Sequence, residues 1–373
     1  MKVAQFIYSL GAGGAETLVK ELACQLRKQG HEVTILLLDK FKETPYEQKA
    51  LKHLKDADVS VINLGRSPGS AGIKSFFKLA KSVNIGKFDI LHSHLTITDI
   101  MAWFMCRYFF KNIRHISTIH NSVIPRRGFI AAIWRYCQRH TTTVFCSQAA
   151  MRANAGILGS ATFINNGIIA SKYEEVKDLG TKTRSMLGIP HNAPIIINVA
   201  RIADQKNQLI LIKAIQKLRG KVPELQCIIC GDGPDRPELE AYIKEHGLTD
   251  AVHLLGIRED IPSLLMASDL FVSTSKWEGL PIAVLEAFFA GIFCVLSPIK
   301  EHIEIAQGVE GVKIYPQNNV GSLSKTIYPI LSSINYDKSE LRQKRKEILQ
   351  PFSMDACADA YLDLYGCLVR NGY

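Results

Sequence analysis

Short apolar runs alternate with longer amphipathic stretches along this chain, as in parallel β-sheets whose strands are joined by helical crossovers. The apolar runs of strand length occupy residues 3–10, 32–39, 59–64, 88–94, 114–120, 142–148, 194–201, 225–232, 251–256, 269–275 and 292–298. The pattern predicts an α/β protein with two Rossmann-like parallel sheets, one in each half of the chain.

A polar, turn-rich stretch near residues 166–192 separates the two halves, and we interpret it as a linker. We therefore predict an N-terminal Rossmann-like domain over residues 1–170 and a C-terminal one over residues 171–350. Residues 351–373 carry apolar side chains at helical spacing. They are expected to form a terminal helix that crosses back to the N-terminal domain.

The 373 residues are 47% hydrophobic and 21% charged, which is typical of a globular protein with two domains. Nine cysteines are scattered, mostly in apolar runs, and are expected to be reduced core thiols of a cytosolic protein. No stretch reaches the roughly 18 apolar residues of a membrane-spanning helix. The start of the chain is typical of a strand and loop rather than of a signal peptide. We expect a cytoplasmic protein, soluble or peripheral at the membrane.

Positive charge is concentrated in the first half. Residues 1–180 contain 24 Lys and Arg against 13 Asp and Glu, a net charge of +11, whereas residues 181–373 contain 21 against 22. Residues 100–173 include no acidic residue. Basic and aromatic side chains interleave there, including Arg126, Arg127, Trp134 and Arg135. Such interleaving suits a face lying on an anionic membrane, although a solvated basic face over a packed helix has the same composition. No nucleic-acid-binding module is present, so nucleic acid is not an expected partner.

Glu278 and Glu286 frame the most informative segment, SKWEGLPIAVLEAFFAG. Pro281 suits the first position of a helix and Gly291 the left-handed residue that ends one. Glu278 is therefore predicted in a loop and Glu286 about one and a half turns into a helix. A carboxylate among so many apolar neighbours needs a partner, which is either a protein group or a ligand. A helix N-terminus attracts a diphosphate, and flanking carboxylates accept hydrogen bonds from sugar hydroxyls.

Two other loops that follow predicted strands suit an anionic ligand. In SLGAGGAETL, Gly13 and Gly14 allow the backbone to approach an anion before a helix. Glu16 stands where a dinucleotide-binding G-x-G-x-x-G motif has its third glycine, which weakens a nicotinamide interpretation. In NVARIADQKN, Arg201 and Lys206 are expected at the carboxyl ends of the strands, where open α/β sheets bind ligands. Two such cations stabilise a diphosphate leaving group without a metal.

His120 ends another predicted strand and so is expected at the same edge, alongside Asn121. An isolated histidine is more often a satisfied structural residue than a functional one. His92 and His94 lie two residues apart and share a strand face. No third metal ligand follows them at a suitable spacing, so packing or contact with an acceptor is their expected role.

The order and spacing of these motifs are similar to those of the retaining GT-B glycosyltransferases of family 4, the glycosyl transferases group 1, of the bacterial surface-polysaccharide type. Separate matches extend over almost the whole chain, at GAGGAE, STIHN, INNGI, ARIADQKN, CGDGP, LGIREDI and EGLPIAVLEA. The resemblance implies the GT-B fold, in which two Rossmann-like domains face a cleft and a C-terminal helix packs across them. The acidic residue that often follows the N-G pair of this family is absent after INNG.

The resemblance also implies roles for individual residues. The catalytic set would be His120, Glu278, Arg201 and Lys206. Glu286 would hold the ribose hydroxyls, Glu278 the donor sugar, and Arg201 with Lys206 the diphosphate. The full donor-binding set would be Gly13, Gly14, Arg201, Lys206, Gly256, Ile257, Glu278, Gly279, Leu280, Pro281 and Glu286. The acceptor or membrane side would include His94, Asn121, Arg126, Arg127, Trp134 and Arg135.

The implied reaction moves a sugar, with retention, from a UDP-hexose or UDP-N-acetylhexosamine to a hydroxyl. The acceptor would be a polyprenyl-diphosphate-linked oligosaccharide of O-antigen or capsule biosynthesis, at the inner face of the cytoplasmic membrane. The nucleotide sugar is a substrate, and neither a cofactor nor a metal is expected. No side chain is a convincing nucleophile, so we expect a front-face mechanism in which a leaving phosphate oxygen takes the acceptor proton.

Three other classes of protein remain open. A nucleotide-sugar epimerase of the same fold needs acid and base residues near the sugar ring. A nicotinamide oxidoreductase uses the first glycine loop but leaves Arg201, Lys206 and the two glutamates unexplained. A non-catalytic module that binds a membrane or nucleic acid through its basic face is indifferent to Glu286→Ala.

Overall fold

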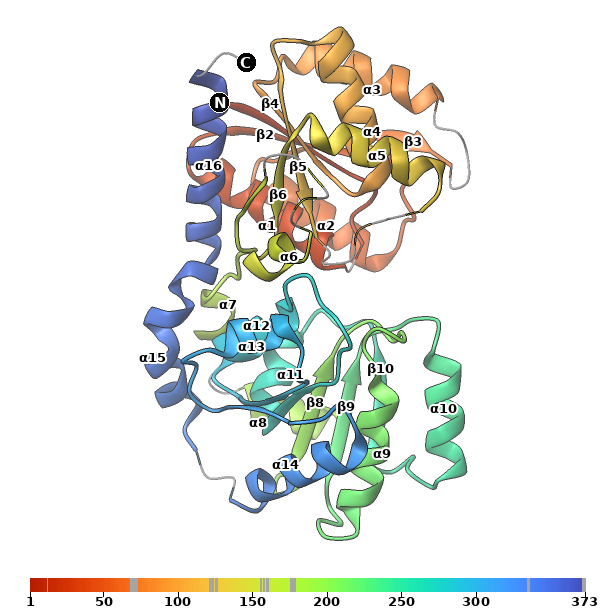
Figure 1. Ribbon diagram of the computed structural model, residues 1–373. Coiled ribbons are helices and arrows are strands. Elements are labelled where there is room, and N and C mark those ends of the chain that lie inside the picture. The colour runs from red at the N-terminus through yellow and green to blue at the C-terminus, as the bar shows by residue number, and fades with distance from the viewer. Residues whose placement is uncertain are drawn as a thin grey trace. The chain divides into compact units, whose positions relative to one another are not determined.

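The computed structural model describes residues 1–11, 13–67, 73–120, 124, 127–154, 156, 158, 161–174, 179–333 and 336–370. The chain forms two compact units, one of Met1–Gly167 with Pro351–Tyr373 and one of Ile168–Gln350 (Figure 1). Each unit is built around its own parallel sheet.

The first unit contains a seven-stranded parallel sheet in the order β3-β2-β1-β4-β5-β6-β7. Its strands are β1 (Lys2–Ile7), β2 (Glu32–Asp39), β3 (Ser60–Arg66), β4 (Ile90–His94), β5 (Arg114–Ile119), β6 (Thr142–Phe145) and β7 (Ala161–Phe163). The strand order changes direction between β1 and β4. At such a switch point the loops after neighbouring strands diverge and leave room for a ligand.

Helices cover both faces of the first sheet. They are α1 (Gly14–Lys28), α2 (Pro45–Asp56), α3 (Ile73–Gly86), α4 (Thr96–Phe104) continued by the π-helix η1 (Met105–Phe109), α5 (Phe129–Arg139), α6 (Gln148–Ala153) and the C-terminal α16 (Met354–Arg370). Residues of α3 and α4 form one buried core with β1, β2 and β4. Helix α16 lies along α1 (Figure 1), where Gln25 and Gln29 donate hydrogen bonds to Asp355 and Asp359.

The second unit contains a six-stranded parallel sheet in the order β10-β9-β8-β11-β12-β13. Its strands are β8 (Ile195–Val199), β9 (Gln226–Cys230), β10 (Val252–Gly256), β11 (Leu270–Ser273), β12 (Phe293–Leu296) and β13 (Val312–Ile314). Here the switch point lies between β8 and β11, which pair directly through Leu270 with Ile196 and Phe271 with Ile197.

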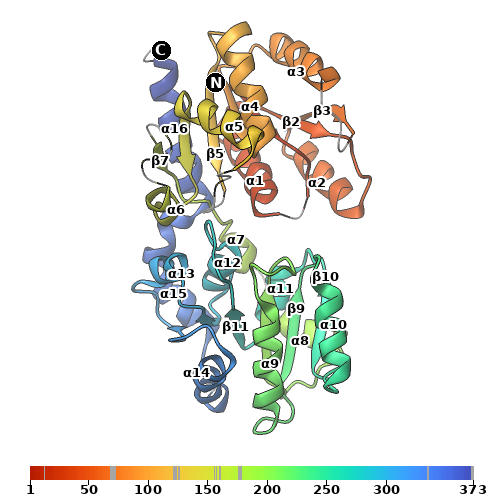
Figure 2. The ribbon, with the colours of Figure 1, turned by 45° about the vertical axis from the view of Figure 1, so that its right-hand side comes forward.

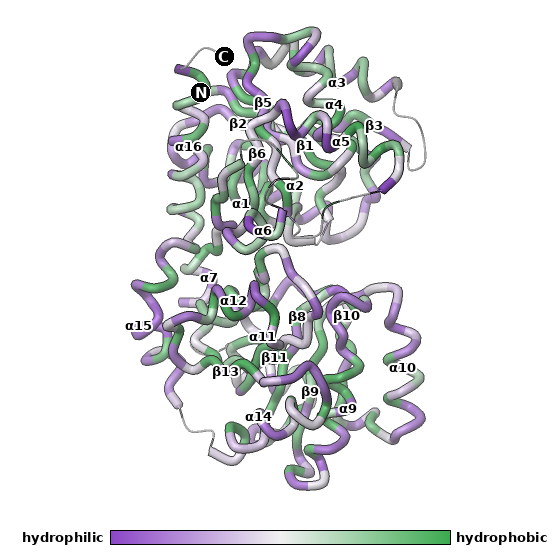
Figure 3. The backbone as a smooth tube through the Cα atoms, in the orientation of Figure 1, coloured by the Kyte–Doolittle hydropathy of each residue, from purple (hydrophilic) through white to green (hydrophobic). Residues whose placement is uncertain are grey.

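The helices of the second unit are α7 (Ser171–Glu174), α8 (Leu179–Met186), α9 (Gln208–Arg219), α10 (Arg236–Glu245), α11 (Ile261–Ala267), α12 (Ile282–Ala290), α13 (Lys300–Ala306), α14 (Val320–Ser332) and α15 (Lys338–Leu349). A short 3₁₀ helix, η2 (Gln350–Phe352), joins α15 to α16. Helices α9, α10 and α14 share one core with the sheet, and Figure 2 shows α9 and α10 beside the strands. In Figure 3, the hydrophilic residues of α15, KSELRQKRKEIL, contrast with the hydrophobic runs of the strands.

All eleven predicted strands are confirmed, and so are the two parallel Rossmann-like sheets. The two strands that the sequence did not predict, β7 and β13, have three residues each, too few for a recognisable apolar run. The interpretation of residues 166–192 as a linker is wrong in part, because these residues include the helices α7 and α8. One of their polar side chains contacts the rest of the second unit: Arg184 on α8 donates to Asp269 and to the Ala267 carbonyl at 2.7 and 2.8 Å.

Candidate functional site

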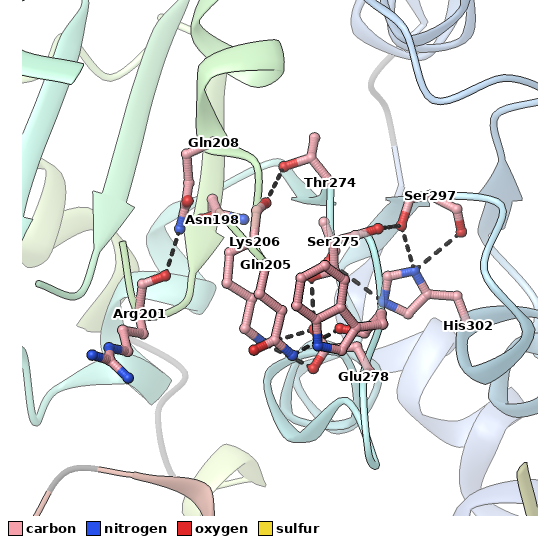
Figure 4. Close-up of polar contacts among 12 residues, drawn as sticks. Asn198, Arg201, Gln205, Lys206, Gln208, Thr274, Ser275, Glu278, Ser297 and His302 are labelled. Atoms are coloured by element: carbon pink, nitrogen blue, oxygen red, sulfur yellow. Dashed lines mark hydrogen bonds and ion pairs between the residues drawn. The ribbon is translucent and has the colours of Figure 1, made fainter. Parts of the chain in front are cut away.

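Two residues of opposite charge meet at the switch point of the second sheet. Lys206 lies in the loop after β8 and Glu278 in the loop after β11, and these strands are neighbours. The Lys206 ammonium donates hydrogen bonds to both carboxylate oxygens of Glu278, at 2.6 and 2.8 Å (Figure 4). Glu278 is only 6% exposed. The structure therefore brings these two predicted residues together at the edge where sheets of this kind bind ligands.

Hydroxyl groups and a histidine support Glu278 from the protein interior. Ser275 Oγ donates to Glu278 Oε1 at 2.6 Å, and Ser273 Oγ lies 3.3 Å from Ser275 Oγ. The ring nitrogens of His302 lie 3.4 Å from Ser273 Oγ and 3.0 Å from Ser297 Oγ (Figure 4). Burial lowers the pKa of His302 to about 4, although the nearby Glu278 acts in the opposite direction. The imidazole is therefore neutral near pH 7, and Lys206 is the cation that balances Glu278.

Arg201 lies in the same loop as Lys206 but does not join the ion pair. Its side chain is exposed, and Figure 4 shows its guanidinium directed away from Lys206 and Glu278. Its backbone carbonyl accepts a hydrogen bond from Gln208 Nε2 at 2.9 Å. Within the described part of the chain, the guanidinium has no ion-pair partner, so its charge is available to an anionic ligand.

The turn after β9, in the CGDGP motif, holds the Arg201 loop in place. The Ile202 N–H donates to the Asp232 carbonyl at 3.0 Å. A Cβ atom on Gly233 would lie 2.0 Å from the Ile202 carbonyl oxygen, a distance that no side chain can adopt. Glycine at this position therefore allows the two loops to approach and fixes the path of the chain at Arg201.

Helix α12 follows Glu278 closely, as the sequence predicts. It ends at Gly291, whose φ of +72° is left-handed, also as predicted. Pro281 is the N-cap and not the first helical residue, because its ψ of +80° lies outside the helical range; the helix begins one residue later. The residues that connect Glu278 to the helix are buried, namely Gly279, Leu280 and Pro281.

Glu286 lies on α12 and has a protein partner in addition to any ligand. The hydroxyl of Tyr173, on α7, donates to Glu286 Oε1 at 3.0 Å. Burial raises the pKa of Glu286, while the Tyr173 hydrogen bond and the charge of Lys172 act in the opposite direction. The sequence did not identify Tyr173, because it lies 113 residues away and no local pattern marks it.

Gly256 and Ile257, expected near a nucleotide base, lie at the end of β10. Gly256 has a φ of +69°, and its carbonyl accepts a hydrogen bond from the Gly231 N–H at 2.7 Å. The Ile257 side chain is exposed. This loop therefore presents backbone groups and one apolar side chain at the carboxyl edge of the second sheet.

The glycine loop of the first unit carries a carboxylate of its own. Gly13 is the N-cap of α1 and Gly14 its first residue. Glu16 folds back over them, so that a Cβ atom on Gly13 would lie 2.3 Å from Glu16 Oε2. Burial raises the pKa of Glu16, whereas a hydrogen bond from its own backbone N–H lowers it. A phosphate that approaches Gly13 and Gly14 therefore has to displace this carboxylate or meet it protonated.

At the switch point of the first sheet, His94 and His120 are in contact. His94 Nδ1 lies 2.9 Å from His120 Nε2, and His94 Nε2 lies 2.7 Å from Gln5 Oε1. Burial lowers the pKa of both histidines, that of His120 to about 4. His92, on the same strand face as His94, bonds to Tyr365 and Thr118 and is a packed core residue. The sequence did not single out Gln5, which lies inside an apolar run.

Two of the predicted acceptor-side residues, Asn121 and Arg126, lie outside the described residues. Arg127 is exposed and Arg135, on α5, is partly buried. Trp134 does not belong to an exposed face: it is 3% exposed, and its indole N–H donates to Asp99 Oδ2 at 2.8 Å. That assignment was wrong because Trp134 lies on the side of α5 that packs on the sheet, where Asp99 satisfies its polar group.

Other aromatic residues of this region are exposed and form what we call the aromatic patch. It consists of Phe77 on α3, Phe104 on α4, Tyr108 and Phe109 on η1, and Tyr136 on α5. Ring contacts join its members in two groups: Phe104 stacks on Tyr108 at 5.8 Å and Trp103 bridges Tyr108 and Tyr136 at 5.9 and 5.6 Å, while Phe76 bridges Phe77 and Phe109 at 6.4 and 6.2 Å. The Arg107 guanidinium lies 5.8 Å from the Tyr108 ring. Apolar and cationic groups thus occur together on this surface.

Among the described residues, no helix is long and apolar enough to cross a membrane. In the same part of the chain, no group of three or more His, Cys, Asp or Glu side chains is arranged to hold a metal ion.

Comparison with known proteins finds two family models that together cover most of the chain. Glycosyltransferase Family 4 matches residues 12–171, and Glycosyl transferases group 1 matches residues 181–348. The UDP-Gal:alpha-D-GlcNAc-diphosphoundecaprenol alpha-1,3-galactosyltransferase of Escherichia coli is 25% identical over 315 residues, 80% of each chain. The GalNAc-alpha-(1->4)-GalNAc-alpha-(1->3)-diNAcBac-PP-undecaprenol alpha-1,4-N-acetyl-D-galactosaminyltransferase of Campylobacter jejuni is 24% identical over 369 residues, 98% of each. The crystal structure of Anabaena Alr3699/HepE with UDP and glucose superposes with a TM-score of 0.83 at 20% identity, covering 98% of this chain and 100% of that one.

Proposed function

Because the chain belongs to glycosyltransferase family 4, the group 1 glycosyl transferases with the GT-B fold, we propose that it moves a sugar from a nucleotide diphosphate to a hydroxyl of a lipid-linked glycan. The single observation that carries this proposal is the Lys206–Glu278 pair at the switch point of the second sheet, with Glu286 eight residues further on. A cation for phosphate and two carboxylates for hydroxyls are the groups that a nucleotide sugar requires.

In this proposal the second unit binds the donor. Arg201, exposed and without an ion-pair partner among the described residues, binds the diphosphate together with Lys206. Glu278 accepts hydrogen bonds from the sugar, and Glu286 accepts them from the ribose. The backbone at Gly256 and Ile257 contacts the base. The Escherichia coli relative uses UDP-Gal, which supports a UDP-hexose or UDP-N-acetylhexosamine as the donor.

The proposed reaction retains the anomeric configuration. The bond between the anomeric carbon and the β-phosphate oxygen breaks, and its electron pair stays with the diphosphate. The acceptor oxygen bonds to the same carbon on the same face, and its proton passes to the departing phosphate oxygen. Arg201 and Lys206 stabilise the charge that develops on this oxygen, a role that we assign to them without a metal ion. In this mechanism Glu278 is assigned to the hydroxyls of the sugar and not to nucleophilic attack, with Ser275 Oγ donating to its Oε1.

On the first unit, we assign His120 to a hydroxyl of the transferred sugar. It follows β5 at the carboxyl edge of the sheet, beside His94 and close to the β1–β4 switch point. Burial keeps its imidazole neutral near pH 7, so that it binds a hydroxyl by hydrogen bonding rather than by charge.

We further propose that the acceptor is polyprenyl-diphosphate-linked and that the protein works at the inner face of the cytoplasmic membrane, in the synthesis of a surface polysaccharide such as O-antigen or capsule. The aromatic patch and the excess of positive charge in the first half of the chain support this, because such surfaces bind anionic bilayers. Both bacterial relatives described above are named for undecaprenol-linked acceptors.

Calorimetric titration with UDP-, GDP- and ADP-sugars, NAD and the free nucleotides tests the donor site. We expect one nucleotide class to bind, and Lys206→Ala and Glu286→Ala each to weaken that binding by at least about tenfold, the loss of a charge-assisted contact. Lys217→Ala is the matched control, since Lys217 is an exposed lysine on α9 away from the loop. Binding of NAD alone, or donor binding that neither substitution changes, would contradict the proposal.

A further inference from the structure

A chain of hydrogen bonds runs through the first unit from the C-terminal helix to His120. Tyr365 on α16 contacts both Gln5 on β1 and His92 on β4: Gln5 Nε2 lies 3.4 Å from the Tyr365 hydroxyl, and His92 Nδ1 lies 2.7 Å from it. Gln5 Oε1 lies 2.7 Å from His94 Nε2, and His94 Nδ1 lies 2.9 Å from His120 Nε2. Gln5, His92, His94 and Tyr365 are fully buried, so water does not compete for these groups.

The direction of each hydrogen bond follows from the groups present. The Gln5 amide directs its NH₂ to Tyr365 and its carbonyl oxygen to His94. A carbonyl oxygen only accepts, so His94 must carry its proton on Nε2. A neutral imidazole has one N–H, and His94 Nδ1 is therefore the acceptor of a proton carried by His120 Nε2. His120 Nδ1 is then left with a lone pair.

Two further observations agree with this arrangement. Tyr365 has one hydroxyl proton, and by accepting from Gln5 it is free to donate to His92 Nδ1. His92 then donates through Nε2 to Thr118 Oγ1 at 2.7 Å, and Thr118 lies 2.9 Å from the Tyr361 hydroxyl. With these assignments, each hydrogen bond from Gln5 to Thr118 has one donor and one acceptor. Burial also lowers the pKa of His92, His94 and His120, so all three rings are neutral near pH 7.

At the His120 end of this series of hydrogen bonds, one acceptor atom has no donor within the described part of the chain. His120 Nδ1 is buried and has no hydrogen-bond partner among the described residues. A buried acceptor without a donor destabilises the folded protein, because it has lost its hydrogen bonds to water. The backbone next to His94 is also strained: Leu95 has a φ of +79° and a ψ of 157°, a conformation that residues other than glycine rarely adopt. Both features are typical of a site that is held ready for a ligand.

We propose that Gln5 and His94 are positioning residues that hold His120 as its Nε2–H tautomer, so that Nδ1 accepts a hydrogen bond from a hydroxyl of the bound sugar. This inference rests on the proposed function and assigns an atom and a direction to the role of His120. Tyr365 orients the Gln5 amide and thereby gives the C-terminal helix a part in preparing the site.

The tautomer can be observed directly by long-range ¹H–¹⁵N correlation on protein labelled with ¹⁵N-histidine, with the His120 signals assigned by comparison with His120→Asn. We expect the Nε2–H tautomer in the unaltered protein. In Gln5→Met, which removes the acceptor at similar size, we expect a mixture of tautomers or the Nδ1–H form. Observation of Nδ1–H in the unaltered protein would overturn the inference.

Kinetics tests whether the tautomer matters for transfer. Gln5→Met should lower kcat about tenfold, the effect of one misdirected hydrogen bond, and leave the donor KM within about twofold. Thr143→Val is the matched control, because Thr143 is a buried hydroxyl residue of the same unit that bonds to Gln138; its kcat and the His120 tautomer should not change. Equal kcat values for Gln5→Met and the unaltered protein would overturn the positioning role.

Tyr365→Phe provides a second variant if Gln5→Met does not fold. It removes the hydroxyl that orients the Gln5 amide, and we expect the same mixture of tautomers with a smaller loss of kcat. Failure of the proposed function has a different signature. A protein that transfers no sugar but shows the Nε2–H tautomer would support the hydrogen-bond chain and overturn its assignment to a sugar hydroxyl.

Discussion

Lys206 and Glu278 are 72 residues apart in the chain, yet the lysine ammonium bonds to both oxygens of the glutamate, at 2.6 and 2.8 Å. The pair is partly enclosed, with 21% of the Lys206 side chain and 8% of the Glu278 side chain exposed. In the proposed function a donor diphosphate competes with Glu278 for Lys206. The ion pair therefore maintains two charges at the site before the substrate arrives, each neutralising the other.

This ion pair predicts that substitutions of Lys206 and Glu278 change folding stability and donor binding independently. Lys206→Met should lower the free energy of unfolding by about 3 kcal/mol, because it leaves a buried carboxylate without its cation. Adding Glu278→Gln should restore much of that stability but not donor binding. Urea unfolding and calorimetry on the same samples measure both. Recovery of donor binding in the double variant would contradict the role of Lys206.

The Tyr173–Glu286 hydrogen bond predicts a pH dependence of donor binding. In the proposed function, Glu286 accepts hydrogen bonds from two ribose hydroxyls in its ionised form. Burial raises its pKa above the usual 4.5, so affinity is complete well above the raised pKa and is lost as the pH falls through it. Tyr173→Phe removes a contact that lowers this pKa, and the loss should then begin at a higher pH. Titration of a UDP-hexose, whose diphosphate does not gain a proton in this range, measures the midpoint; an unchanged midpoint would contradict the account.

The CGDGP turn predicts that one methyl group added at Gly233 lowers donor affinity, although Gly233 is not assigned to donor binding. In Gly233→Ala the new Cβ would lie 2.0 Å from the Ile202 carbonyl, so the Arg201 loop must shift, and donor affinity should fall at least about tenfold, the loss of one charge-assisted contact. Gly220→Ala is the control: Gly220 lies at the end of α9 with a φ of −63°, and a Cβ atom there has room. That variant should bind donor normally and be unchanged or slightly more stable.

Buried neutral histidines predict that acid destabilises the first unit. Burial lowers the pKa of His115 to about 3, against about 6.5 in an unfolded chain. Between these values the unfolded form binds one more proton, so stability is complete above pH 6.5 and decreases as the pH falls, by about 1.4 kcal/mol per unit for each such histidine. His115→Gln should make the slope of unfolding free energy against pH shallower by that amount. Burial raises the pKa of Asp99 to about 6, so this carboxyl increases the stability of the folded protein as the pH falls. Asp99 is present in both proteins, and its contribution therefore cancels in the comparison. Equal slopes for the two proteins would contradict the prediction.

The aromatic patch predicts binding to anionic bilayers. Replacing Tyr108 and Phe109, which are 59% and 64% exposed, by Ser should weaken sedimentation with vesicles of phosphatidylglycerol and phosphatidylcholine about tenfold or more, since each ring loses apolar area that enters the interface. Met186→Ser removes an exposed apolar side chain of the second unit and should have no effect. Equal binding of all three proteins would show that the patch does not contact the membrane.

The strands and the helix end that depend on a local pattern of residues could be predicted from the sequence. The eleven longer strands follow from their apolar runs, and Gly291 ends α12 because a left-handed residue there suits glycine. The sequence also placed Lys206 at the carboxyl end of a strand and Glu278 in a loop before a helix, and both positions are observed.

Contacts between distant segments were not predictable in the same way. Nothing near Tyr173 marks it as the partner of Glu286, and Gln5 is one polar residue within an apolar strand. Trp134 was misassigned because composition alone does not tell which side of α5 packs on the sheet. The helix α8 was missed because its polar composition is typical of a linker, although one of its polar residues, Arg184, bonds to Ala267 and Asp269 of the second unit.

The most direct test of the central claim is a transfer assay. The protein is incubated with the UDP-sugar that binds and with synthetic polyprenyl-diphosphate-linked acceptors, and the product linkage is determined by NMR. We predict release of UDP and transfer of the sugar with the anomeric configuration of the donor, abolished by Lys206→Met and unaffected by Lys217→Ala. Transfer with inverted configuration, or binding of the donor without transfer to any hydroxyl acceptor, would contradict the account.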